Sequence, residues 1–201
     1  MINIGAILLA AGGSSRMGRT KQLLRIEGQS LVRRAAGAAL DAGCRPVTIV
    51  TGSDSDAVAA EISDLPVQIE FNPNWSAGIG GSIRRGLSAS LANDPSVAAL
   101  ILMLCDQPHL SSKILHDLML AWPAGGKPMA ACEYAGTFGP PCCFARSSFD
   151  QLSNLSDSDG AKRLLLANPA MVTAIPWPPG ADDLDTPADW MRLGGPENRN
   201  L

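Results

Sequence analysis

The sequence lacks an excess of positive charge. Its 201 residues include 16 Lys and Arg against 19 Asp and Glu, which gives a formal net charge of −3. Proteins that bind the backbone of DNA or RNA use clustered basic side chains to neutralise its phosphates. The charge balance therefore argues against a nucleic-acid partner.

A long apolar run is also missing. The first apolar stretch, residues 2–10, stops before Gly12 and is too short to cross a bilayer. No charged leader precedes it, and no cleavage pattern follows it. We expect a cytoplasmic protein without membrane association.

Cysteine and histidine are scarce. The five cysteines form an odd set without CxxC spacing, which excludes a disulfide framework and a zinc site as expectations and favours reduced, mostly buried thiols. The two histidines are not accompanied by a serine or cysteine nucleophile motif. The residues concerned are Cys44, Cys105, Cys132, Cys142, Cys143, His109 and His116.

No polar or Pro/Gly-rich linker divides the middle of the chain, and no internal repeat is visible. We therefore expect a single domain over residues 1–193. Residues 194–201 contain glycine, proline and polar residues without periodicity, so we expect a flexible tail there.

Apolar segments alternate with segments of helical periodicity along the first two thirds of the chain. Strands this apolar are covered on both faces, so the pattern predicts an α/β fold of three layers, with helices on both faces of a mostly parallel, twisted sheet. The expected strands are residues 2–10, 47–51, 67–71, 97–104 and 129–134, and the expected helices are residues 31–42, 57–62, 81–91 and 111–120. Beyond them, prolines predict added strands and loops over one edge, and a closing helix from Thr186 and Pro187.

A loop of small residues follows the first expected strand. Gly12, Gly13 and Gly18 let backbone N–H groups approach an anion, and the loop also carries Arg16, Arg19 and Lys21. In α/β sheets, ligands bind outside the carboxyl ends of the strands, where this loop falls. We expect the N–H groups of residues 12–18 to hold phosphates, and hence a nucleotide.

Two known phosphate-binding motifs do not fully match the loop. The dinucleotide fingerprint fails because Ser15 stands where a glycine is needed, which disfavours a nicotinamide or flavin enzyme. A Walker A motif is missed by one residue: Gly13 and Gly18 have its spacing, but Arg19 stands where the compact lysine belongs. The apolar strand before Asp106 mimics Walker B, so a P-loop-like nucleotide switch stays open as an alternative.

Several motifs occur in one order along the chain. Together they resemble the MobA-like nucleotidyltransferases, in particular the MocA-like molybdenum cofactor cytidylyltransferase branch. The motifs are Leu9-Ala10-Ala11-Gly12 with Arg16-Met17-Gly18 and Lys21, then Asn72-Pro73-Asn74-Trp75 with Gly78, Gly81 and Ser82, then Cys105-Asp106-Gln107-Pro108, Gly139-Pro140-Pro141, Gly160-Ala161-Lys162 and Asp185-Thr186-Pro187.

The resemblance implies a Rossmann-like nucleotidyltransferase fold and the transfer of CMP from CTP to molybdopterin, the molybdenum cofactor, with release of pyrophosphate. Ala11 is typical of the cytidine-using members. Client enzymes of the xanthine dehydrogenase type are implied as partners. Another acceptor, such as a sugar phosphate, and a cofactor-delivery protein without chemistry are the alternatives.

In such a reaction a phosphate of the acceptor attacks the α-phosphorus of the triphosphate. The nucleophile is already ionised, so alignment and charge compensation suffice and no histidine base is needed. Mg²⁺, or Mn²⁺, takes one or two carboxylates from a protein. We expect Asp106 and Asp185 to be these ligands, with Asp182 and Asp183 as neighbouring alternatives; Asp106 as a turn acid and Asp185 as part of a helix start are the competing interpretations.

We expect Lys21, Arg16 and Asp106 to be catalytic, with Lys21 as the charge partner of the triphosphate and Arg19 turned to solvent. Trp75 is interpreted as a stacking wall or as packing, Ser82 as a base or ribose contact or as a helix cap, His109 as an acceptor contact or a structural residue, and His116 as a surface residue. Either Cys142 or Cys143 is expected to face the acceptor. Asp159 is expected to begin a helix, and the alternative is that the segment 157–159 contacts the second substrate. The expected nucleotide-binding residues are Leu9, Ala10, Ala11, Gly12, Gly13, Arg16, Gly18, Lys21, Asn72, Gly81, Ser82 and Asp106.

Overall fold

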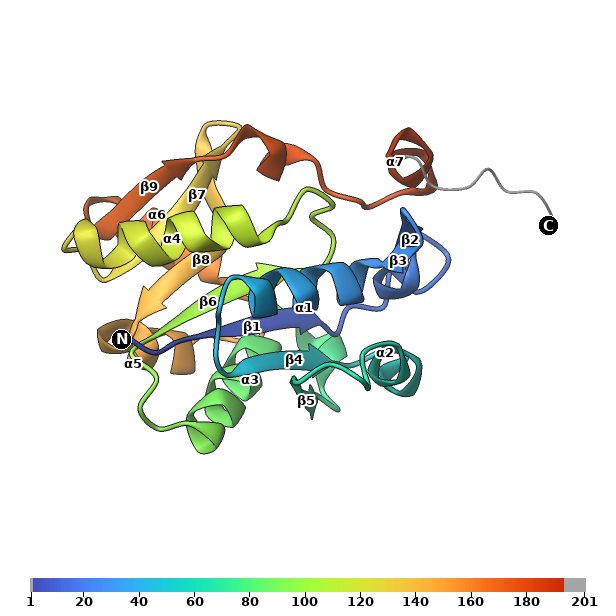
Figure 1. The fold of residues 1–201 in the computed structure, drawn as a ribbon, viewed down its shortest axis with the longest axis horizontal. Helices are drawn as coiled ribbons and strands as arrows, with labels where there is room; N and C mark the ends of the chain where they lie inside the picture. Colours follow the sequence, from blue (N-terminus) through green and yellow to red (C-terminus); the bar gives the residue numbers. More distant parts are fainter. Residues whose placement is uncertain (1, 194–201) are drawn as a thin grey trace.

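The computed structural model describes residues 2–193, and its centre is a seven-stranded sheet (Figure 1). The strand order is β5-β4-β1-β6-β8-β7-β9. Only β8 runs antiparallel to its neighbours, so the predicted mostly parallel sheet is confirmed. The strands are β1 (Ile4–Ala10), β4 (Val47–Thr51), β5 (Gln68–Phe71), β6 (Ala99–Leu104), β7 (Met129–Tyr134), β8 (Thr137–Ala145) and β9 (Val172–Pro176).

Helices cover both faces of the sheet, as expected. In Figure 1, α1 and α4 lie in front of the sheet and α3 and α5 lie behind it. The helices are α1 (Leu31–Asp41), α2 (Ser55–Glu61), α3 (Ile79–Asn93), α4 (Ser112–Ala124), α5 (Phe149–Ser153), α6 (Ala161–Ala167) and α7 (Pro187–Arg192). Short 3₁₀ turns lie at Lys21–Leu23, Trp75–Ala77, Arg146–Ser148, Pro169–Met171 and Pro178–Ala181, and a hairpin of β2 (Arg25–Ile26) and β3 (Gln29–Ser30) precedes α1.

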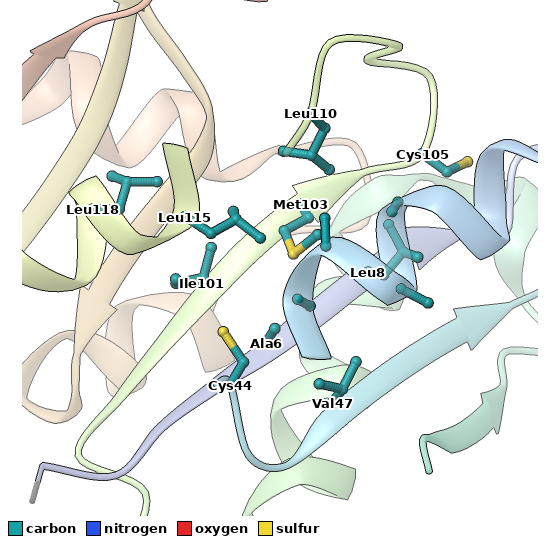
Figure 2. Close-up of a cluster of buried hydrophobic side chains, with 14 of the residues drawn as sticks. Ala6, Leu8, Cys44, Val47, Ile101, Met103, Cys105, Leu110, Leu115 and Leu118 are labelled. Atoms are coloured by element: carbon teal, nitrogen blue, oxygen red, sulfur yellow. The ribbon is translucent and has the colours of Figure 1, made fainter. Parts of the chain in front are cut away.

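Alternate residues of β1 supply two separate cores. Leu8 belongs to the cluster beneath α1 and α4, part of which Figure 2 shows around Met103 and Leu115. Ile7 belongs to the cluster beneath α3, α5 and α6. Successive side chains of a strand point to opposite faces, so a strand between two helical layers must be apolar at every position. This is the physical reason for the continuous apolar runs in the sequence.

A third, smaller cluster lies at the carboxyl edge of the sheet. It joins the loop after β1, the β2–β3 hairpin and α7, which are far apart in the chain. Trp190 is buried in it and donates from its indole N–H to the carbonyl of Arg25 at 3.4 Å. Its other members are Met17, Leu24, Ile26, Leu31 and Leu184. This cluster holds the end of the described chain against the first loop.

The expected elements are present, with shifted ends. The first strand begins at Ile4, and α3 begins at Ile79 because Gly78 is its N-cap. The sequence did not reveal α5 or β9, whereas the helix expected from Asp159 is present as α6 with a shifted start. The expected tail, residues 194–201, lies outside the described residues. Within residues 2–193 no helix has both the length and the apolar character to cross a bilayer.

The cysteines are free and buried, as expected. The expectation that Cys142 or Cys143 faces an acceptor is wrong. Both lie in β8 and are at most 1% exposed, because the two sheet faces they point to are each covered by a helical layer. Burial raises the pKa of Cys105 to about 12, so this thiol stays neutral.

Two helix-interior glycines allow a matched test of how closely α3 packs on the sheet. A Cβ on Gly86 of α3 would lie 2.5 Å from Cγ2 of Ile7, whereas a Cβ on Gly37 of α1 meets nothing within 4 Å. Both changes to alanine gain helix propensity, about 0.5–1 kcal/mol. We predict that Gly37→Ala raises the free energy of unfolding by about this amount and that Gly86→Ala lowers it by about 1–3 kcal/mol. Urea unfolding measures both, and equal effects would contradict the close contact.

Candidate functional site

The carboxyl ends of β1, β4, β5 and β6 meet at one edge of the sheet because these strands are parallel. A pocket of about 390 Å³ opens there. In the parallel register Leu9 of β1 lies beside Leu104 of β6, so the loop after β1 and Asp106 must be neighbours. The pocket is lined by Leu9, Ala11, Gly12, Ser14, Ser15, Arg16, Lys21, Gln22, Trp75, Ser76, Gly78, Ile79, Ser82, Leu104, Cys105, Asp106 and Asp185.

The buried side chain of Gln22 holds the loop after β1 in shape. Its amide donates to the carbonyl of Ala10 at 2.9 Å and to that of Gly12 at 2.8 Å. The hydroxyl of Ser14 accepts from the backbone N–H of Lys21 at 2.9 Å. The sequence analysis gave Gln22 no role, since nothing in a local pattern says which carbonyls a glutamine reaches.

Part of the expected phosphate cradle is already engaged within the loop. The N–H groups of Met17 and Gly18 donate to the carbonyl of Ser14, at 3.0 and 3.3 Å. The loop turns through positive φ at Ser14 and at Gly18. The N–H groups of residues 17 and 18 therefore stabilise the turn, which corrects the expectation that the whole run from residue 12 to 18 faces a ligand.

Four charged side chains converge at the pocket. The ammonium of Lys21 lies 2.8 Å from Oδ2 of Asp106 and 2.9 Å from Oδ1 of Asp185. The guanidinium of Arg16 lies 2.9 Å from Oδ2 of Asp185. The side chain of Lys21 is only 15% exposed, whereas that of Arg16 is 70% exposed. The predicted convergence of loop and carboxylates is thus present in the structure.

The pKa values follow from these contacts. Burial lowers the pKa of Lys21, but the charge of Asp106 and hydrogen bonds to both carboxylates outweigh it and raise the pKa above its usual range. The hydrogen bond from Lys21 lowers the pKa of Asp185. Burial, with the charges of Asp106 and Asp185, raises the pKa of Asp183 to about 6. The site therefore carries more negative charge than its two ion-paired carboxylates alone.

The chain around Asp185 is held by backbone contacts. The N–H of Leu184 donates to the carbonyl of Asp106 at 2.9 Å. The start of α7 is capped by Thr186, whose hydroxyl accepts from the N–H of Asp189 while the carboxylate of Asp189 accepts from the N–H of Thr186. Capping is thus done by its neighbours, and the carboxylate of Asp185 is left to face Lys21.

The carboxylate of Asp106 offers a position for a cation. Its Oδ1 is buried without a hydrogen-bond partner among the described residues, while Oδ2 accepts from Lys21. An orphaned carboxylate oxygen is costly unless a cation or donor meets it. Within residues 2–193 no three His, Cys, Asp or Glu side chains gather as a complete metal site. Two carboxylates and the oxygens of a bound polyphosphate are a set that Mg²⁺ accepts, so the residues fit.

Trp75 forms one wall of the pocket and packs against two glycines. A Cβ on Gly13 would lie 2.8 Å from the ring of Trp75, and a Cβ on Gly52 would lie 2.6 Å from its Cβ. Gly13 is therefore needed for contact with Trp75. These contacts confirm the packing interpretation of Trp75, and its stacking on a base stays a prediction.

Ser82 lies inside the first turn of α3 and is not its cap, which excludes one interpretation. Its hydroxyl accepts from the buried side-chain amide of Asn72 at 3.0 Å and lines the pocket. Asn72 is not among the lining residues and is connected to the pocket through Ser82. Gly81 lies next to Asp157 and away from the pocket lining.

Of the remaining residues that were expected to bind the nucleotide, some line the pocket and others do not. Leu9, Ala11 and Gly12 line the pocket, whereas Ala10, Gly13 and Gly18 do not. Ala10 belongs to the core beneath α1, and Gly18 lies in the turn that the carbonyl of Ser14 closes.

Other expected residues have protein partners. Arg19 is exposed, and its guanidinium carbon lies 5.2 Å from the ring centre of Trp190, so it is not simply turned to solvent. His109 lies 3.1 Å from Asp182, outside the pocket lining, and His116 is exposed on α4 as expected. The helix expected from Asp159 is present as α6, but it starts at Ala161 after its N-cap Gly160.

Gln107 belongs to a motif that was noted in the sequence, but no separate role was expected for it. It is 3% exposed and donates to the carbonyl of Pro140 at 2.9 Å and to that of Gly180 at 3.3 Å. It ties the turn after Asp106 to β8 and to the segment that leads to Asp185. A polar residue directly after a buried strand was the available signal.

The sheet and the pocket at its carboxyl edge define a Rossmann-like α/β fold, which is shared by the solved structure of a nucleotidyl transferase at 20% identity and a TM-score of 0.79. Residues 6–172 match the family described as the MobA-like NTP transferase domain. The chain therefore belongs to the MobA-like NTP transferase family.

Similar proteins support this assignment. Over 123 residues, 61% of this chain, the sequence is 37% identical to nicotine blue oxidoreductase of Paenarthrobacter nicotinovorans, and the match spans 58% of that relative's length. The purine catabolism protein PucB of Bacillus subtilis is 27% identical over 92% of both chains. The crystal structure of Rv0371c from Mycobacterium tuberculosis superimposes with a TM-score of 0.81 at 27% identity, covering 96% of this chain and 97% of the other.

The role of Gln22 in holding the loop can be tested with an isosteric change. In Gln22→Glu the carboxylate cannot donate to the carbonyls of Ala10 and Gly12, so the free energy of unfolding falls by about 1–3 kcal/mol. Gln29→Glu makes the same change at an exposed position and alters stability by less than about 0.5 kcal/mol. Thermal unfolding of both variants checks this, and equal stability of the two would refute the clamp.

Proposed function

We propose that this protein is a metal-dependent nucleotidyltransferase that transfers CMP from CTP to molybdopterin and releases pyrophosphate. The observation that carries the proposal is the meeting of Lys21 with Asp106 and Asp185 at the mouth of a pocket beside a glycine-rich loop. We further propose that it acts in the cytoplasm and serves client enzymes of the xanthine dehydrogenase type.

The chain's own residues supply alignment and charge. Lys21 and Arg16 provide the positive charge that a triphosphate requires, and the loop places both at the pocket. Asp106 and Asp185 would hold Mg²⁺ or Mn²⁺, which neutralises charge that develops on the phosphoryl oxygens. An acceptor phosphate needs no general base, in keeping with a pocket lining that contains no histidine among the described residues.

Support for the metal and the nucleotide also comes from neighbours. One solved structure of Rv0371c is a complex with manganese, at 25% identity and a TM-score of 0.74. CTP as donor and molybdopterin as acceptor rest on the resemblance of the motifs, with Ala11 lining the pocket where the base would lie.

The P-loop alternative is disfavoured by the local fold. A Walker A loop leads directly into an α-helix whose N-terminus meets the phosphates. Here the loop leads into the short 3₁₀ turn Lys21–Leu23 and a hairpin, and the next α-helix begins only at Leu31. A sugar phosphate remains the alternative acceptor. One relative, nicotine blue oxidoreductase, is named for redox chemistry, so redox activity must be tested as well.

The deciding experiment supplies each NTP with Mg²⁺, with and without molybdopterin, and measures pyrophosphate. The transferase predicts release that requires the acceptor and is fastest with CTP. NTP hydrolysis without acceptor would favour a nucleotide switch. Release of pyrophosphate with a sugar phosphate but not with molybdopterin would identify the sugar phosphate as the acceptor. Redox turnover of nicotine blue, without any nucleotide transfer, would contradict the proposal.

Asp106→Asn tests the charge at the centre of the site. It keeps the shape of the side chain but removes the negative charge, so we predict a loss of kcat of about 10²–10³-fold with an unchanged fold. Asp117→Asn is the control, because Asp117 pairs with Lys113 on α4, away from the pocket. If Asp106→Asn turns over as fast as the wild type in the pyrophosphate assay, Asp106 is not part of the catalytic site.

A further inference from the structure

The pocket holds its own cation between the two carboxylates. The ammonium of Lys21 contacts Asp106 and Asp185 at the same time, and Arg16 occupies the remaining oxygen of Asp185. Two positive side chains thus compensate two negative ones. Asp106 and Asp185 themselves therefore have no excess negative charge with which to attract a further cation while Lys21 stays in this place, and Asp183 is the neighbouring acid that adds negative charge to the site.

Lys21 cannot pair with the two carboxylates and bind the phosphates of a nucleotide at the same time. The proposed reaction needs its ammonium at the phosphates of the nucleotide, yet in this structure both of its short contacts are to carboxylates. A divalent cation beside Asp106 would also stand close to the ammonium and be repelled by it, strongly so because the side chain of Lys21 is only 15% exposed. Of the four oxygens of these two carboxylates, only Oδ1 of Asp106 lacks a hydrogen-bond partner among the described residues.

We propose that Lys21 is an internal counter-ion that blocks the divalent-cation site until the triphosphate draws it away, so that nucleotide and cation bind with positive coupling. Coupling between two ligands is reciprocal. The factor by which the nucleotide increases the affinity for the cation therefore equals the factor by which the cation increases the affinity for the nucleotide. The inference rests on the proposed function, since it takes the ligand to be a triphosphate with a divalent cation.

The test measures binding of Mn²⁺ alone, without nucleotide or acceptor, by the electron paramagnetic resonance signal of the free ion. Lys21→Met keeps the length of the side chain and removes its charge. We expect Mn²⁺ to bind this variant about tenfold more tightly than the wild type. Mn²⁺ should also raise the melting temperature of the variant more than that of the wild type.

Three further variants make the result specific. Lys113→Met removes one positive charge on α4, where Lys113 pairs with Asp117, and should leave Mn²⁺ binding unchanged. Adding Asp106→Asn to Lys21→Met should abolish the tighter binding. Arg16→Met removes the exposed cation from Asp185 and should tighten Mn²⁺ binding about threefold, which provides a test even where Lys21→Met does not fold.

Equal or weaker Mn²⁺ binding by Lys21→Met and Arg16→Met would overturn the inference. So would equal tightening by Lys113→Met, or tightening that survives Asp106→Asn. This outcome is separate from the fate of the proposed function: turnover with CTP and molybdopterin tests the reaction, whereas Mn²⁺ binding without nucleotide tests the block.

Discussion

The ion-pair cluster around Lys21 is the constraint on which the arrangement of the pocket depends. It joins the loop after β1, the turn after β6 and the segment before α7. Removing one partner from such a partly buried cluster leaves the others uncompensated, which costs more than the pair itself contributes. The three segments must therefore keep their positions together, and much of the surrounding structure serves this requirement.

Each segment is positioned by contacts that do not involve charge. Gln22 ties the loop to the end of β1, the N–H of Leu184 binds the carbonyl of Asp106, and Trp190 buries α7 against the hairpin. Neutral hydrogen bonds and apolar packing persist at high salt, whereas exposed ion pairs are screened. The three segments are thus held together by neutral contacts as well as by the ion pairs around Lys21.

The sequence predicted those parts of the fold that a local pattern specifies. The apolar runs of β1, β4 and β6 follow from burial on both faces, and the parallel register then brings the loop and Asp106 to one edge. The approach of Asp185 was implied only by resemblance, because the path from β9 to α7 is set by long-range contacts. A helix was expected to begin at Asp159, and α6 begins instead at Ala161 because Gly160 is its N-cap. Strand β9 was missed because it ends at Pro176 and has exposed positions.

The distribution of charge constrains what can bind. The carboxylates of Asp106 and Asp185 are compensated by Lys21 and Arg16, but Asp183 adds a further negative group, whose raised pKa records the burial and the two neighbouring acids. An anionic ligand that takes Lys21 and Arg16 for itself leaves the carboxylates unpaired. A polyphosphate with its bound metal supplies a cation that can take the place of these side chains, in keeping with the proposed function.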